Sequence, residues 1–135
     1  MESRLFLDTN VFLDLIFDRG GTGKSIKLFL LKSGAQKCQL VTSISCIQTI
    51  IYLLEKNKYS KASIKEFVVY VNELVTLANT TKSDIGKAVS SDLSDLEDAI
   101  LYFTAISNEC GVFITRNTKD YPASDKISIL KPEEF

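Results

Sequence analysis

Residues 5–16 read LFLDTNVFLDLI, and within this stretch the hydrophobic pattern changes from that of a strand to that of a helix. The first three residues are apolar and consecutive, which is typical of a short buried strand. Residues 8–10, Asp-Thr-Asn, end the apolar run with residue types that favour the start of a helix. The apolar residues that follow recur at helical spacing, so we predict a strand, a polar turn and a helix that ends near Phe17.

Hydrophobic patterns of these two kinds alternate through the rest of the chain. Further strands are predicted at 39–42, 74–78, 112–115 and 127–130, and further helices at 24–32, 44–56, 61–72, 83–90 and 94–110. We expect the helix from Lys24 to stop at Gly34, and the last helix to stop at Cys110-Gly111. Short apolar strands between amphipathic helices indicate one α/β domain, residues 1–135, with a parallel sheet covered on both faces.

Composition restricts the chemistry that this chain can perform. The net charge is −1 and the isoelectric point is about 5.5, which argues against a strongly basic nucleic-acid-binding module. The sequence contains no histidine, so catalysis by Ser-His-Asp or Cys-His groups and metal binding by imidazole are excluded. Acid–base or metal chemistry must therefore rest on carboxylates, and a bound divalent cation would itself bring positive charge to the site.

The cysteines and the lack of long apolar runs indicate where the protein works. The three cysteines, Cys38, Cys46 and Cys110, form no C-x-x-C pair and fit free thiols in a reducing compartment. Cys46 and Cys110 have apolar neighbours, so we expect both in the core. No apolar run approaches the ~20 residues that cross a bilayer, and no signal peptide is visible. We therefore expect a cytoplasmic protein with no membrane partner.

The first candidate for a functional group is Asp8, which directly follows the first predicted strand. Parallel α/β sheets place their working residues at the carboxyl ends of strands. Asp8, Thr9 and Asn10 offer one carboxylate and two neutral oxygens on a single turn. All three types are also favoured helix N-caps, so capping is the alternative explanation for Asp8.

A second acidic group, at 92–98, lies at the start of the last predicted helix. Ser94 and Glu97 match a capping box, which would explain part of this group. Capping explains Asp98 less well, because Asp95 and Asp98 are three residues apart and share a helical face. Two carboxylates held together repel each other unless a cation lies between them, and Mg²⁺ or Mn²⁺ suits such oxygen ligands.

A third polar segment, TRNTKDY at 115–121, follows the fourth predicted strand. A solvated loop is one interpretation. The other is that Asn117 or Asp120 supplies a last polar or acidic ligand at the same sheet edge as Asp8. The sequence pattern alone leaves both interpretations open.

Three motifs, taken in order, resemble those of the PIN-domain family. FLDTNVFLDL at 6–15 resembles the opening of PIN domains, and LEDAI at 96–100 resembles their later acidic helix. FITRNTKDY at 113–121 resembles their fourth strand and the loop after it. The order and spacing cover nearly the whole chain. The resemblance implies a three-layer α/β/α fold with a central parallel sheet of about five strands.

The PIN-domain family includes the VapC-like ribonuclease toxins of bacterial toxin–antitoxin pairs. The resemblance therefore implies a Mg²⁺- or Mn²⁺-dependent endoribonuclease that cleaves RNA. The residues that it assigns to the site are the catalytic and metal-binding carboxylates Asp8, Asp98 and Asp120, the further ligand candidate Asn117, and the supporting residues Asn10 and Thr115. Such toxins commonly form homodimers and are held inactive by a small antitoxin, so both are partners to expect.

The chain departs from the family pattern on its third predicted helix. The family usually carries a Glu there, a few residues after the Ser that follows the second strand. Counted from Ser43, this place falls at Thr49, which carries no charge. Losing one carboxylate should weaken metal affinity, and Asp95 is a candidate to compensate. The alternative function is therefore a catalytically impaired PIN-like domain that binds RNA or protein.

Overall fold

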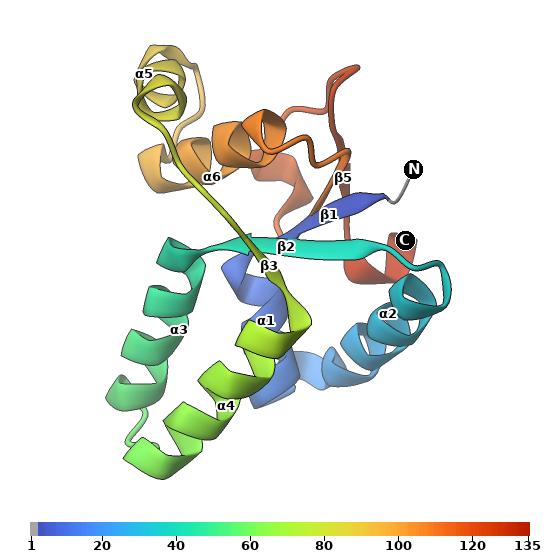
Figure 1. Ribbon diagram of the computed structural model, residues 1–135, viewed down its shortest axis with the longest axis vertical. Helices are drawn as coiled ribbons and strands as arrows, with labels where there is room; N and C mark the ends of the chain where they lie inside the picture. The colour runs from blue at the N-terminus through green and yellow to red at the C-terminus, as the bar shows by residue number, and fades with distance from the viewer. Residues whose placement is uncertain (1–2) are drawn as a thin grey trace.

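The computed structural model describes residues 3–135 and contains one sheet of five parallel strands in the order β3-β2-β1-β4-β5 (Figure 1). The strands are β1 (Arg4–Leu7), β2 (Gln39–Ser43), β3 (Thr76–Ala78), β4 (Val112–Ile114) and β5 (Ser128–Leu130). The helices are α1 (Thr9–Phe17), α2 (Gly23–Ala35), α3 (Ile44–Lys56), α4 (Lys61–Leu74), α5 (Lys82–Ser90) and α6 (Leu96–Ser107). Short 3₁₀ helices are η1 (Arg19–Gly21), η2 (Thr118–Asp120) and η3 (Pro132–Glu134).

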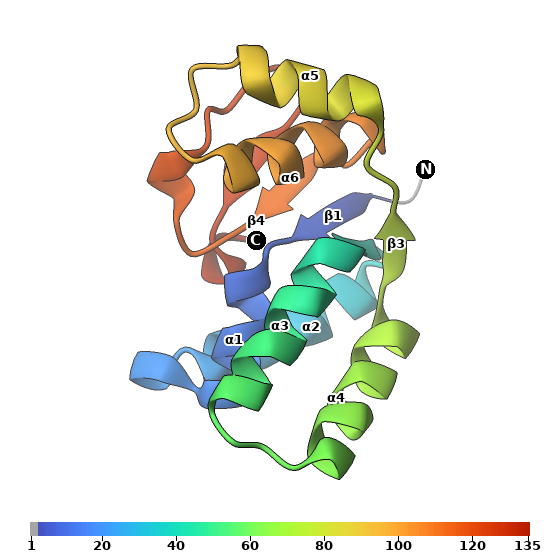
Figure 2. The ribbon, with the colours of Figure 1, turned by 90° about the vertical axis from the view of Figure 1, so that its left-hand side faces the viewer.

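Helices cover both faces of the sheet, so the expected three-layer α/β/α architecture is confirmed. Helices α1 to α4 lie on one side, and α6 lies on the other with α5 packed outside it (Figure 2). Side chains alternate along a strand, so Leu5 and Leu7 join the core beneath α1 to α3, whereas Phe6 joins the core beneath α6. The Phe6 ring stacks on Phe113 of β4 at 5.2 Å between centroids, which couples the two central strands.

Helix α3 begins as the sequence predicts, and this sets one wall of the site described below. The Ser43 side chain accepts a hydrogen bond from the backbone N–H of Cys46, which makes Ser43 the N-cap. The apolar face of α3 is buried against α1 and the sheet through Ile47, Ile50 and Leu54. Its opposite face is left exposed to solvent.

Two helix ends differ from the prediction. Gly34 lies inside α2, and α6 ends at Ser107 rather than at Cys110-Gly111. Each helix is instead closed by a left-handed residue other than glycine, Lys37 with φ of 56° and Glu109 with φ of 60°. The backbone N–H of the next residue, a cysteine in both cases, then donates back to the carbonyl five positions earlier. This is the Schellman arrangement, which normally carries glycine at the left-handed position.

The start of α6 also differs from the prediction. The N-cap is Asp95, whose carboxylate accepts a hydrogen bond from the backbone N–H of Asp98, and Ser94 lies outside the helix. The expected capping box between Ser94 and Glu97 is therefore wrong. Because the N-cap is Asp95 instead of Ser94, the helix starts one residue later than predicted. Glu97 then lies in the first turn and does not cap the helix.

Cys46 and Cys110 are buried, as predicted, and all three cysteines are free thiols. Between residues 3 and 135, no helix combines the length and the apolar character that a membrane span requires.

Candidate active site

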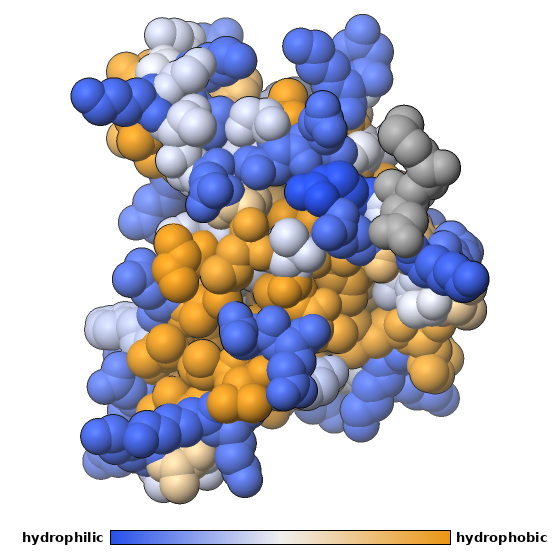
Figure 3. Space-filling view, in the orientation of Figure 1, coloured by the Kyte–Doolittle hydropathy of each residue, from blue (hydrophilic) through white to orange (hydrophobic). Residues whose placement is uncertain are grey.

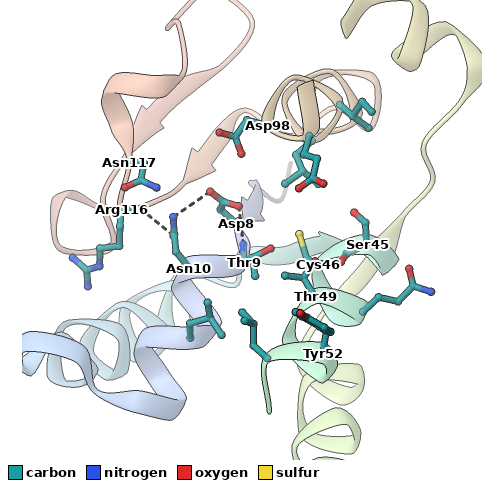
Figure 4. Close-up of a pocket in the computed structure, with 16 residues that line it drawn as sticks. Asp8, Thr9, Asn10, Ser45, Cys46, Thr49, Tyr52, Asp98, Arg116 and Asn117 are labelled. Carbon is teal, nitrogen blue, oxygen red and sulfur yellow. Dashed lines mark hydrogen bonds between the residues drawn. The ribbon is translucent and has the colours of Figure 1, made fainter. Parts of the chain in front are cut away.

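A cavity of about 730 Å³ opens at the carboxyl ends of β1 and β4. The start of α1, the exposed face of α3, the first turn of α6 and the loop after β4 form its walls. Figure 4 shows Asp8 and Asp98 directed toward the same space, from the end of β1 and from α6. This is the sheet edge where parallel α/β proteins bind their ligands.

Asp8 caps α1 and lines the cavity at the same time. Its side chain is 6% exposed, and its Oδ1 accepts a hydrogen bond from the backbone N–H of Thr9 at 2.7 Å. Its Oδ2 accepts one from the hydroxyl of the buried Thr115 at 2.9 Å. The capping interpretation and the site interpretation of Asp8 are therefore compatible, because separate oxygens carry the two sets of contacts.

Asn10 links α1 to the loop after β4. Its amide nitrogen lies 3.3 Å from Asp8 Oδ2 and 3.2 Å from Thr115 Oγ1. Its amide oxygen accepts a hydrogen bond from the backbone N–H of Arg116 at 3.1 Å. Thr115 Oγ1 also accepts one from the backbone N–H of Asn117, at 3.1 Å. Asn10 and Thr115 thus support the position of Asp8 and of the loop that carries Asn117.

Asp98 lies in the first turn of α6 and is partly exposed to the cavity. Its position is fixed by Asp95, whose Oδ1 accepts the backbone N–H of Asp98 at 2.9 Å. Asp95 itself is exposed and is not among the residues that line the cavity. Its charge acts on the site from outside, since it contributes to raising the pKa of Asp98.

Tyr121 joins the two carboxylates, a role that was not predicted from the sequence. Its hydroxyl donates to Asp8 Oδ2 at 3.3 Å and also interacts with the Asp98 carboxylate. Burial, followed by the charges of Asp8 and Asp98, raises the pKa of Tyr121, so its hydroxyl stays a proton donor. The available signal was an aromatic residue directly after Asp120, but nothing local indicates that its hydroxyl reaches residues 23 and 113 positions away.

Both carboxylates are held in surroundings that disfavour their charge. Burial raises the pKa of Asp8, opposed by the hydrogen bonds from Thr115, Thr9 and Tyr121. Burial also raises the pKa of Asp98, and the charges of Asp95, Asp8 and Asp120 raise it further. Among the side chains that the structure describes, no lysine or arginine forms an ion pair with either carboxylate. A cation would relieve this unfavourable charge.

The loop after β4 brings its two predicted ligand residues to different places. Asn117 lines the cavity. Asp120 is exposed and does not line it, although its charge raises the pKa of both Asp8 and Asp98. Within residues 3–135, no three acidic, cysteine or histidine side chains are grouped so that they could hold one metal ion. The acidic residues that line the cavity are therefore Asp8, Asp98 and Glu97, with neutral oxygens beside them.

The α3 wall of the cavity carries no carboxylate. Ser45, Gln48, Thr49 and Tyr52 face the cavity from this helix, and the Thr49 hydroxyl donates to the backbone carbonyl of Ser45 at 2.9 Å. Thr49 lines the cavity, so the uncharged residue at this position leaves the α3 wall without negative charge. The carboxylate of Glu97, which the sequence had suggested as part of a capping box, lines the opposite wall on α6.

Arg116 fixes the loop after β4, and the sequence did not predict this role. Its Nε donates to Asp14 Oδ2 of α1 at 2.6 Å, and its Nη1 donates to Glu133 of η3. Asp14 is buried, whereas Glu133 is half-exposed. The three residues are far apart in sequence, so no local pattern indicates their pairing.

Comparisons with known proteins agree with this geometry. Residues 4–119 match the family model described as PIN domain. The chain is 31% identical over 143 residues to ribonuclease VapC1 of Aquifex aeolicus, an alignment that covers 98% of this chain and 92% of that protein. Among solved structures it is similar to a toxin-antitoxin complex from Klebsiella pneumoniae, with a TM-score of 0.68, 24% identity, and 96% and 98% of the two chains covered. It is also similar to VapBC2 from Rickettsia felis bound to a DNA fragment from their promoter, with a TM-score of 0.67, 14% identity, and 95% and 97% covered. On the family match and the sequence identity, this chain belongs to the PIN-domain family.

Proposed function

We propose that the chain is a metal-dependent endoribonuclease that hydrolyses RNA phosphodiester bonds at the cavity between Asp8 and Asp98. The observation that carries this proposal is the facing pair of carboxylates, which share one tyrosine hydroxyl and have no cationic partner among the described side chains. Membership of the PIN-domain family and the name of the Aquifex relative, a ribonuclease, support the reaction class.

The residues at the cavity fit a hard divalent cation, Mg²⁺ or Mn²⁺. Asp8 and Asp98 would hold it, with Asn117 as a neutral oxygen ligand and Asp120 as an additional negative charge at the edge of the site. Such an ion supplies an activated water and neutralises charge on the phosphate.

The chain's own residues prepare the carboxylates for this task. Thr9 and Thr115 hold Asp8 in one rotamer, and Asp95 fixes the backbone of Asp98. With no histidine in the sequence, proton transfer would fall to carboxylates or bound water. Glu97, next to Asp98 in the sequence, is a further carboxylate that lines the cavity.

We extend the proposal to the biological role of a toxin from a cytoplasmic toxin–antitoxin pair. The two similar solved structures are a toxin-antitoxin complex and a VapBC complex, which supports an antitoxin as partner. Figure 3 shows apolar side chains gathered on the face that β3 and α4 present, where Leu77 and Val69 are exposed. An exposed apolar face of this kind supports a protein partner, either an antitoxin or a second copy in a homodimer.

The direct test is cleavage of RNA by the purified chain. With Mg²⁺ or Mn²⁺ we expect fragments of a labelled RNA, no fragments in EDTA, and no fragments from Asp98→Asn. Asp125→Asn, which removes an exposed carboxylate from the loop before β5, is the matched control and should cleave like the parent. Cleavage that persists in EDTA, or in Asp98→Asn, would contradict the proposal.

One observation favours a second candidate, a PIN-like domain that binds RNA or protein without cleaving it. Thr49 stands where the family usually has a Glu, and its hydroxyl is used within its own helix. Under this alternative, the chain would bind RNA equally well with Mg²⁺ and with EDTA, and no fragment would appear in either condition.

A further inference from the structure

The exposed face of α3 forms a wall of the cavity that the metal chemistry does not use. Ser45, Thr49 and Tyr52 recur at intervals of four and three residues, so they form one stripe along the helix. Figure 4 shows all three on the α3 side of the cavity, across from Asp98 and Asn117. The stripe begins near the carboxylates and runs away from them along α3.

Tyr52 is the aromatic residue of this wall, and its ring is largely exposed to solvent. Its side chain is 62% exposed, and it makes no ring contact or hydrogen bond with any residue of 3–135. A half-buried leucine, Leu53, and the buried Leu13 of α1 line the cavity beside it. The ring therefore offers an uncovered face next to an apolar floor.

Gln48 adds a free amide to the same wall. It lies one turn before Tyr52, lines the cavity, and forms no hydrogen bond with another described residue. A glutamine amide presents a donor and an acceptor together, which is the pattern needed to pair with the edge of a nucleobase.

The charge along the wall changes from neutral to basic. No carboxylate of α3 faces the cavity. One turn beyond Tyr52 the stripe reaches the exposed Lys56, and Lys58 follows in the turn before α4. A polyanionic strand that leaves the carboxylates along this wall would meet no carboxylate of α3 inside the cavity and would then reach Lys56 and Lys58, with the exposed Glu55 next to Lys56.

From these contacts we propose that the α3 wall is a nucleobase subsite, in which the Tyr52 ring stacks on an unpaired base and Gln48 bonds to the edge of that base. The proposal rests on the proposed ribonuclease function, because it names single-stranded RNA as the substrate class of the same cavity. Bases in a duplex are already stacked on each other and cannot lie on the ring, so paired RNA is excluded from this subsite.

The test is the affinity of the chain, residues 1–135, for a fluorescently labelled single-stranded oligoribonucleotide of about ten nucleotides. Affinity is measured by fluorescence anisotropy in EDTA, and again with Ca²⁺ in place of Mg²⁺. Tyr52→Ala should weaken binding by about 5- to 150-fold, the range expected for losing one base–aromatic stack. Tyr52→Phe, which keeps the ring, should bind like the parent. Annealing the complementary strand should abolish the difference between Tyr52→Ala and the parent.

Tyr70→Ala is the matched control, because Tyr70 is a 42% exposed tyrosine on α4 that does not line the cavity. A loss of affinity no greater than in this control would overturn the subsite. No binding of the oligonucleotide by the parent, in either buffer, would overturn it as well. Since Tyr52 is exposed, the thermal unfolding of Tyr52→Ala should match that of the parent, and a large drop would mean that the ring has a structural role instead.

Taken with the cleavage assay described above, this binding measurement separates the two proposals. RNA cleavage by the parent, with full binding by Tyr52→Ala, would sink the subsite and leave the nuclease. Binding that depends on Tyr52, without any metal-dependent cleavage, would keep the subsite and reject the nuclease.

Discussion

The hydroxyl of Tyr121 interacts with both carboxylates of the candidate site. It is a neutral donor shared by two carboxylates that otherwise face each other across the cavity. Because a hydrogen bond to a charged group contributes more than one between neutral groups, this single hydroxyl has a measurable effect on the metal-free protein.

Tyr121→Phe should therefore lower the free energy of unfolding by about 1.5–3 kcal/mol without metal. The loss should shrink with saturating Mn²⁺, because a cation between the carboxylates replaces the missing donor. Urea denaturation with and without Mn²⁺ measures both values. Tyr102→Phe is the control, since the Tyr102 hydroxyl donates to the carbonyl of Pro122, and its loss should be the same with and without Mn²⁺.

The raised pKa of Asp98 predicts how stability varies with pH. The folded state holds this proton more tightly than the unfolded chain does. Protonation therefore favours folding, and the contribution is lost as the pH rises from the unfolded pKa, about 4, through the raised value. Asp98→Asn carries no charge at any pH. In thermal unfolding with EDTA, it should be more stable than the parent near pH 7 and should show no such gain below about pH 4. An equal gain at both values would mean that charge is not the cause.

At the scale of elements, the start of α6 decides where Asp98 lies. Asp95 supplies the N-cap and Ser94 supplies none, so the two neighbouring residues make a sharp comparison. Asp95→Ala should lower the free energy of unfolding by about 1 kcal/mol, whereas Asp95→Asn should change it by a few tenths, since asparagine caps equally well. Ser94→Ala should have no effect in the same denaturation experiment. A larger loss for Ser94→Ala than for Asp95→Ala would restore the capping box as the correct interpretation.

The strands and helices were predicted from the sequence more accurately than the ends of the helices. The order of strands and helices follows from hydrophobic period. Asp8, Asp98 and Asn117, which line one cavity, could be proposed as site residues because strand ends and first helical turns are local features. The ends of α2 and α6 were missed, since Lys37 and Glu109 adopt left-handed backbone angles that favour glycine. Lys58 closes α3 in the same way with Tyr59 after it, so no residue type common to the three ends marks them in the sequence.

The contacts of Tyr121 and Arg116 were missed for a different reason. Arg116 pairs with one residue 102 positions before it and with another 17 positions after it. Residues so far apart in sequence come into contact only in the folded protein. Charged residues at 14 and 133 look like ordinary surface positions in the sequence. The carboxylate pair was predictable, whereas the residues that hold it in place were not.

At the scale of the whole molecule, one guanidinium ties three distant segments together. Arg116 joins α1 through the buried Asp14 and joins η3 through the half-exposed Glu133. Its Nη2 is buried and has no acceptor among the described residues. If Asp14 or Glu133 were removed, the guanidinium would therefore have no spare acceptor to replace the lost hydrogen bond. The guanidinium therefore holds the loop that carries Asn117 against the rest of the domain.

Asp14→Ala should lower the free energy of unfolding by about 3–5 kcal/mol, because it leaves a largely buried guanidinium without its main partner. Glu133→Ala removes an exposed partner of the same group and should cost about 0–1 kcal/mol. Denaturant titration of the two variants measures the difference. Equal losses would show that burial does not control the strength of this network.

Calorimetric titration of Mn²⁺ into the purified chain shows whether Asp8 and Asp98 together hold a divalent cation. We expect saturable binding by the parent and by Asp125→Asn, and no measurable binding by Asp8→Asn or Asp98→Asn. No binding of Mn²⁺ to the parent at millimolar concentration, or binding that survives both substitutions, would contradict the claim.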